Sequence, residues 1–308
     1  KIIAAAPTVY DMAAYPKTLS GKTVATYVNT HTDLSDELYR EGKLVSDNYK
    51  NILRSQTNAA AIPAEVTVRY GVTVRRANLR NLPTGEGLFF YASDRNFDAL
   101  QETALDPGEA VAILHTSTNG YFYYVQAYNY RGWLSKFDVA ETDRSTWLRY
   151  AEPKNFLTVV AKDYTLKADG AQVLFQQGAR LQLADKKASA YTVKVPVRTK
   201  EGKLQEEKVV LAANASLHEG YLPYTTNNII RSAFKFYDSV YGWGGLQQSV
   251  DCSSFISNAY RTVGIFLPRN ADEQETSAGI HKQMGNMNSA QRANVINGLT
   301  PGSTLHMD

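Results

Sequence analysis

Apolar side chains recur at three- and four-residue spacings in two short stretches near the N-terminus. The first stretch holds Leu34 and Leu38, and the second holds Val45, Tyr49, Ile52 and Leu53. This spacing places apolar side chains on one face of an α-helix. We therefore expect residues 1–64 to form a helical packing segment without a catalytic role.

Alternation replaces helical spacing in the next region. Apolar residues occupy every second position over residues 66–74, which predicts a half-exposed strand. Pro83-Thr84-Gly85 and Pro107-Gly108 predict loops, and Asn119-Gly120 between two apolar runs predicts a hairpin. Arg131-Gly132-Trp133-Leu134 predicts a last short strand. About five short strands without a long helix indicate a small closed or partly closed barrel.

A second β region follows a break at Trp147 to Pro153. Asp169-Gly170 and Glu201-Gly202 predict turns, and alternation over residues 191–197 predicts a strand between them. Pro196 has no backbone N–H to donate, which predicts that this strand lies at the edge of its sheet. The two β regions are therefore interpreted as tandem barrels, although no shared motif makes them a repeat.

Helical spacing returns after Tyr224. From Ile229 to Val240, apolar residues recur every three or four positions, which predicts a helix. Thr226 and Asn227, which precede this stretch, are suitable N-cap residues. A glycine-rich loop, residues 242–245, follows this predicted helix.

A second helix is predicted from Cys252 to Val263, with Asp251 at its N-cap and Gly264 at its end. Its predicted core face carries apolar residues only, namely Phe255, Ile256, Ala259, Tyr260 and Val263. Cys252 then lies in the first turn, where free N–H groups and the helix dipole stabilise a thiolate. The alternative is a buried, inert cysteine, but the polar neighbours Asp251, Ser253 and Ser254 favour a nucleophile.

Composition narrows the possible classes of protein. The chain has 308 residues, 44% of them apolar and 20% charged, which indicates two or three folded domains. Its single cysteine excludes an intrachain disulfide, and a formal charge of +3 gives no argument for nucleic acid as a partner. No apolar run approaches the roughly 18 residues of a membrane span. Neither ligand-spaced Cys or His nor a nucleotide fingerprint occurs, so we expect neither a metal nor a cofactor.

Three motifs gather in the last quarter of the chain: Tyr241-Gly242-Trp243-Gly244-Gly245, Asp251-Cys252-Ser253-Ser254-Phe255 and Leu267-Pro268-Arg269. Together they resemble the signature of the NlpC family of papain-like cell-wall cysteine peptidases. The order of regions is similar to the multidomain branch of that family, the γ-D-glutamyl-L-diamino acid endopeptidases. This resemblance implies a helical stabilising segment (1–64), two SH3-like β-barrels (65–150 and 151–222) and an α+β papain-like peptidase domain (223–308).

The resemblance also implies roles for residues of these motifs. Cys252 matches the nucleophile that attacks the γ-D-glutamyl carbonyl of a peptidoglycan stem peptide and forms a thioester. Its backbone N–H and the Tyr241 hydroxyl would hold the oxyanion. Trp243, Asp251 and Ser253 would line the substrate site, although a plain helix N-cap explains Asp251 equally well.

Three further residues match the family's substrate-binding positions. Arg269 matches a motif arginine, with a surface ion pair as the alternative. Asn270 stands where relatives that require a free N-terminal L-alanine have an aspartate, so strict dependence on a free amine is not expected. Tyr130 matches a tyrosine that the first barrel lends to one wall of the site, although an ordinary strand tyrosine is the favoured interpretation.

The general base of the family is the part that this sequence does not supply. Relatives have a Gly-His-Val type motif after a lead-in strand, and here residues 301–308 match that strand, where the sequence stops. We therefore expect a peptidase domain that is incomplete at its C-terminus, in a fragment of a longer chain. His306 is interpreted as a strand histidine rather than as the base. The other histidines lie in unrelated segments: His31, His115, His218 and His281.

Two functions follow from these observations. The favoured one is a monomeric cysteine endopeptidase that cleaves the γ-D-glutamyl to diamino acid bond of stem peptides or muropeptides, in the periplasm or outside the cell. Cytoplasmic recycling of muropeptides is an alternative setting. The rival function is a non-catalytic wall-binding protein with SH3-like modules and a degenerate peptidase domain. The Asp-Cys-Ser motif favours the enzyme, and the missing histidine favours the binder.

Overall fold

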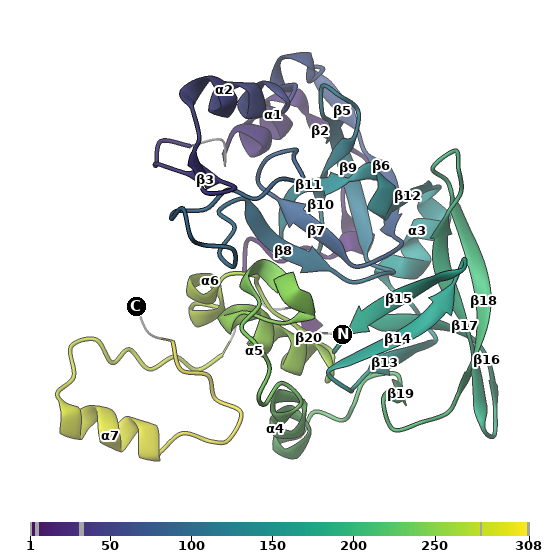
Figure 1. Cartoon of the computed structure of the whole chain (residues 1–308). Coiled ribbons are helices and arrows are strands. Elements are labelled where there is room, and N and C mark those ends of the chain that lie inside the picture. The colour runs from purple at the N-terminus through teal and green to yellow at the C-terminus, as the bar shows by residue number, and fades with distance from the viewer. Residues whose placement is uncertain (1, 4–5, 31–33, 278, 307–308) are drawn as a thin grey trace.

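The computed structural model describes residues 2–3, 6–30, 34–277 and 279–306, which form two β units with helices packed around them (Figure 1). The N-terminal segment holds β1 Ile2–Ile3, η1 Met12–Ala14, β2 Thr18–Ser20, α1 Gly21–Asn29, β3 Tyr39–Arg40, β4 Lys43–Leu44, α2 Asp47–Ser55 and η2 Ala59–Ala61. Helix α2 confirms the second predicted helix, and Ser46 Oγ caps it by accepting the Tyr49 amide. The helix predicted at Leu34 and Leu38 is wrong. Both side chains lie outside any helix and are buried in a core cluster with Leu53. Their four-residue spacing therefore reflects burial in a shared core and not a helical turn.

The first β unit, residues 65–142, contains the predicted short strands and more. Its elements are β5 Glu65–Thr67, β6 Arg69–Thr73, β7 Ala77–Arg80, β8 Gln101–Leu105, β9 Ala110–Thr116, β10 Phe122–Gln126, β11 Arg131–Ser135, η3 Lys136–Asp138 and β12 Val139–Thr142. Seven of these strands form one sheet in the order β12-β6-β9-β10-β11-β7-β8. The Asn119-Gly120 hairpin is confirmed between β9 and β10. The single strand predicted over residues 66–74 is divided at Val68, because β5 pairs with β2 whereas β6 pairs with β9 and β12.

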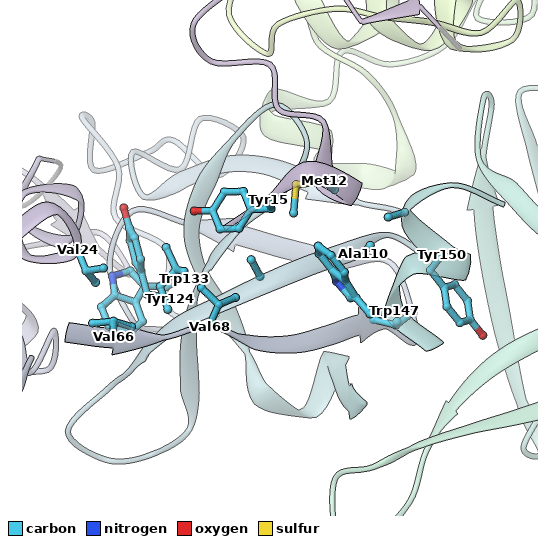
Figure 2. Packing of buried hydrophobic residues seen from close by; sticks show 14 of the residues in the cluster. Met12, Tyr15, Val24, Val66, Val68, Ala110, Tyr124, Trp133, Trp147 and Tyr150 are labelled. Atoms are coloured by element: carbon cyan, nitrogen blue, oxygen red, sulfur yellow. The ribbon is translucent and has the colours of Figure 1, made fainter. Parts of the chain in front are cut away.

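The break predicted at Trp147 to Pro153 is instead the helix α3 Arg144–Ala151. Asp143 caps its start by accepting the Thr146 amide. Trp147 is fully buried and its Nε1 donates to the Val111 carbonyl oxygen at 3.1 Å. Figure 2 shows Trp147 beside Ala110 in the core that the first β unit shares with the N-terminal segment.

The second β unit, residues 156–219, has the sheet order β18-β17-β16-β13-β19 and a separate β14-β15 hairpin. Its strands are β13 Phe156–Val159, β14 Asp163–Ala168, β15 Ala171–Gln176, β16 Arg180–Lys187, β17 Ala190–Arg198, β18 Leu204–Ala212 and β19 Leu217–Glu219. The Asp169-Gly170 turn is confirmed. The edge position predicted from Pro196 is wrong, because β17 lies between β16 and β18. Pro196 is tolerated there since the β16 pairing ends at Lys194, so it removes no ladder hydrogen bond on that side.

The C-terminal region holds α4 Thr226–Phe234, η4 Trp243–Gln248, α5 Cys252–Arg261, β20 Ile265–Phe266, α6 Ala271–Glu275 and α7 Ser289–Asn297. It places η4 and α5 against the β units, whereas its last helix, α7, lies away from both of them (Figure 1). Helix α5 confirms the predicted cysteine helix, and Gly264 ends it with φ of 81°. Among the described residues, no helix combines the length and apolarity needed to cross a membrane.

Two predictions for this region are wrong. Helix α4 starts behind Thr225, whose Oγ1 accepts the Asn228 amide, and it ends at Phe234 rather than at Val240. Tyr237 and Val240 are exposed, so burial of these side chains does not stabilise a longer helix. Residues 301–306 form a turn and coil without strand pairing, whereas a lead-in strand was expected.

Candidate functional site

The start of helix α5 presents the thiol of Cys252 to solvent. Asp251 and Ser254 form a capping box, in which Asp251 Oδ1 accepts the Ser254 amide at 3.0 Å and Ser254 Oγ accepts the Asp251 amide at 2.9 Å. Two free N–H groups of the helix end are thereby satisfied, and the first turn is fixed. Cys252 thus lies in the predicted first turn of the helix, and its side chain is exposed rather than buried.

Behind the thiol lies a buried ion pair between Asp251 and Arg269, with Arg269 Nη2 2.6 Å from Asp251 Oδ2. The same guanidinium donates to Ser253 Oγ at 2.6 Å and to the Glu102 carbonyl oxygen at 2.7 Å. Burial alone would raise the pKa of Asp251, but Arg269 and the Ser254 bonds hold it below its ordinary value. The surface ion pair considered for Arg269 is therefore wrong: its side chain connects the cysteine helix to strand β8.

Tyr241 borders the thiol at the start of the glycine-rich loop, in which Trp243 follows. The Tyr241 hydroxyl donates toward Cys252 Sγ at 3.8 Å. Burial, followed by the hydrogen bond to the thiol, raises the pKa of Tyr241 to about 12, so its hydroxyl stays protonated and available as a donor. Trp243 Nε1 donates to the Asp98 carbonyl oxygen at 3.0 Å. Phe97, which sequence reasoning missed, lies 6.1 Å from Tyr241 between ring centroids and adds an aromatic edge from the first β unit.

Three further polar residues, Tyr130, Asn270 and Glu102, interact with one another and with Arg269. The Tyr130 hydroxyl donates to Glu102 Oε2 at 2.6 Å. Burial, and then the Glu102 charge, raise the pKa of Tyr130, while Arg269 and a hydrogen bond with Asn270 act against that rise. The three polar side chains therefore lie together beside Arg269. Glu102 was missed because a single acid in strand β8 carries no motif.

The buried face of α5 is largely polar, which corrects the predicted apolar core face in part: Ala259 and Val263 are buried as predicted, but polar side chains are buried with them. Ser257, Asn258 and Arg261 are buried, whereas Phe255 and Tyr260 are only half-buried. The reason is tertiary: this face meets both β units. Its contacts are hydrogen bonds from Asn258 to Gln176 at 2.9 Å and from Arg261 to Asp106 and Glu109 at 3.2 and 2.7 Å.

The described histidines form their hydrogen bonds away from the thiol. His115 bonds to the Asn58 carbonyl oxygen, His218 to that of Gly220, and His306 to Thr304 Oγ1. His281 is exposed, and His31 lies outside the described residues. Within the described ranges, the hydrogen bond at Cys252 Sγ therefore comes from Tyr241 and not from a histidine.

Comparison with known proteins gives matches to two family models and to several solved structures. Residues 238–302 match the NlpC/P60 family, and residues 88–135 match an SH3 domain of the SH3b1 type. The structure of an NlpC/P60 endopeptidase from Photobacterium damselae subsp. piscicida has a TM-score of 0.72 and 22% identity, covering 88% of this chain and 60% of that chain. An NlpC/P60 family protein from Bacillus cereus ATCC 10987 has a TM-score of 0.48 and 18% identity, covering 60% of this chain and 64% of that chain. No curated protein matches this chain.

These matches confirm the predicted combination of an SH3-type domain with an NlpC/P60 domain. The chain spans about 60% of the length of the Photobacterium structure. The motifs around Tyr241, Cys252 and Arg269 all lie inside the NlpC/P60 match.

Proposed function

We propose that this chain, with its NlpC/P60 domain, is a cysteine peptidase of bacterial cell-wall peptides. The observation that carries the proposal is the exposed Cys252 thiol at a capped helix start beside the Tyr241 hydroxyl, within residues that match the family. The Cys252 thiolate attacks an amide carbonyl, expels the amine and forms a thioester that water then hydrolyses. The Cys252 backbone N–H and Tyr241 Oη donate to the oxyanion. Such a reaction belongs in the periplasm or outside the cell, where peptidoglycan lies.

The finer proposal is cleavage between D-glutamate and the diamino acid of a stem peptide with a free N-terminal amine. Among the described residues, no lysine or arginine forms an ion pair with the Glu102 carboxylate, so a cationic group of the substrate can be its partner. Tyr130 and Asn270 add neutral polar atoms beside it. Glu102 thus supplies the charge that Asn270 lacks. Trp243 and Ser253 border the acyl side, with Asp251 and Arg269 holding Ser253 from behind.

Cleavage of a synthetic L-Ala-γ-D-Glu-diamino acid tripeptide tests both levels of the proposal. Release of the dipeptide, followed by mass spectrometry, is expected for the wild-type chain and absent for Cys252→Ala. Prior acetylation of the L-Ala amine is expected to reduce cleavage, because it removes the charge that Glu102 binds. Equal cleavage by wild type and Cys252→Ala would contradict the peptidase, and equal cleavage of the two peptides would contradict the amine site alone.

One observation favours a second candidate, a wall-binding protein without catalysis. In the described part of the chain, no histidine hydrogen-bonds to Cys252 as a general base would. Sedimentation with purified peptidoglycan separates the two candidates. Binding that is retained in Cys252→Ala, with no peptide released by the wild-type chain, supports the binder.

A further inference from the structure

The loop of residues 242–249, which joins Tyr241 to the cysteine helix, has an unusual backbone. Gly244, Gly245, Gln247 and Gln248 have φ values of 55°, 81°, 56° and 53°. Left-handed backbone is uncommon for residues with a side chain, and two consecutive glutamines adopt it here. Such a conformation persists only where the surroundings impose it.

The first β unit holds the loop through Gln101 of strand β8. This side chain is 3% exposed, and its Nε2 donates to the Gly244 carbonyl oxygen at 2.8 Å. Gln101 Oε1 accepts from Arg80 Nη1 at 3.2 Å, and Arg80 is fixed in turn by a buried ion pair with Asp98. A Cβ on Gly244 would lie 2.6 Å from Gln101 Cγ, so loop and strand are in direct contact. Gln101 is therefore held rigidly against the middle of the loop.

The second β unit holds the other end of the loop through Gln176 of strand β15. Gln176 is 3% exposed, and its Nε2 donates to the Ser249 carbonyl oxygen at 3.1 Å. Its Oε1 accepts from Asn258 of helix α5 at 2.9 Å, and its backbone N–H donates to Asp106 Oδ1 at 2.9 Å. One residue thus joins the loop, the nucleophile helix and the first β unit.

We propose that Gln101 and Gln176 are positioning residues that impose the loop conformation and so keep the Tyr241 hydroxyl beside Cys252 Sγ. Neither side chain touches the thiol. Each donates to the carbonyl group of a buried loop residue, and a buried carbonyl group that loses its donor is costly. Both β units then contribute to catalysis through the loop. Only the effect on kcat rests on the proposed function; the role of the two glutamines in holding the loop does not.

Gln101→Met and Gln176→Met test this proposal, because methionine keeps the unbranched shape but cannot donate to a carbonyl group. Gln182→Met is the matched control: Gln182 Nε2 donates to the Arg149 carbonyl oxygen at 3.2 Å, away from the loop. The first readout is acrylamide quenching of tryptophan fluorescence. Two of the three tryptophans are fully buried and Trp243 is 37% exposed, so quenching reports on the loop.

We expect quenching to increase in Gln101→Met and Gln176→Met and to stay at the wild-type level in Gln182→Met. With the tripeptide, kcat should fall about tenfold in each positioning variant with little change in KM, since the oxyanion donor is displaced. Unchanged quenching and unchanged kcat in both positioning variants would overturn the inference. Increased quenching without cleavage by any form, wild type included, would uphold the loop assignment and count against the peptidase instead.

Thermal unfolding identifies a variant that does not fold. Gln101→Glu then replaces Gln101→Met, because a glutamate still accepts from Arg80 but presents only acceptors to the Gly244 carbonyl group. The same quenching and kcat changes are expected of it. Wild-type values in a folded Gln101→Glu would equally overturn the inference.

Discussion

The two β units meet helix α5 in different ways. The first unit brings Glu102 and Tyr130 beside Arg269, and Phe97 beside Tyr241 at the edge of the glycine-rich loop. The second unit approaches from behind, where the Gln176 side chain and the Gly178 backbone meet α5. The two units therefore contribute differently, although both hold α5. The first supplies the side chains beside Arg269 and Tyr241 and also pairs with Arg261, whereas the second contacts α5 from behind only.

The largest effect on stability is expected at Arg261, which both β units contact. Arg261 pairs with Asp106 and Glu109 of the first unit and packs against Gly178 of the second. Arg261→Met would leave buried carboxylates without this partner and lower the free energy of unfolding by about 3–5 kcal/mol. Urea unfolding measures the loss. Lys186→Met, which breaks an exposed pair with Glu219, should change the free energy of unfolding far less, because water screens that pair. Equal losses in the two variants would contradict a shared anchor at Arg261.

A smaller loss of stability is expected at the contact of the second unit alone. Gly178 has φ of 83°, and a Cβ there would lie 2.6 Å from Arg261 Cβ. Gly178→Ala should lower the free energy of unfolding by about 2 kcal/mol, because it adds backbone strain and a clash. Gly170→Ala has similar strain at φ of 73° but open space around it, so the difference between the two variants isolates the α5 contact. Identical unfolding midpoints would show that the second unit does not press on α5.

An effect on activity without one on stability is expected from Glu102 of the first unit. Glu102→Gln removes the carboxylate charge, so kcat/KM for the tripeptide with a free amine should fall about tenfold. The acetylated tripeptide should show no such fall. Glu86→Gln is the matched control, since Glu86 lies in the same β unit but pairs with Arg40 of the N-terminal segment. An equal fall for both peptides would remove Glu102 from amine binding.

The smallest effect is a change of stability with pH that arises from Asp251. Its folded pKa lies below the ordinary value of 3.8, so the ionised carboxylate stabilises the fold above that pH. This contribution is lost as the pH falls below about 3.8. The difference in Tm between wild type and Asp251→Asn should therefore be constant near neutral pH and narrow in acid. A difference that widens in acid would reverse the sign assigned to Asp251.

Much of the fold and part of the site could be predicted because the deciding contacts are short-range. The Asp251 to Ser254 capping box and the Gly264 end define helix α5 within a few residues of sequence. The hairpins at Asn119-Gly120 and Asp169-Gly170 are equally local. Trp147 shows where local prediction fails. The sequence from Trp147 to Pro153 predicts a break between domains, but Trp147 lies in helix α3, where its indole is buried and donates to the Val111 carbonyl oxygen.

The sequence by itself determined that a cysteine begins a capped helix after a glycine-rich loop, because those hydrogen bonds join neighbouring residues. Only the tertiary structure decided what surrounds that cysteine. Glu102 and Gln101 lie 167 and 143 residues from their partners Arg269 and Gly244, and no local pattern records such contacts. The polar face of α5 is likewise decided by long-range contacts. It is buried because both β units supply hydrogen-bond partners to it, and the periodicity of apolar residues does not report on partners in other segments.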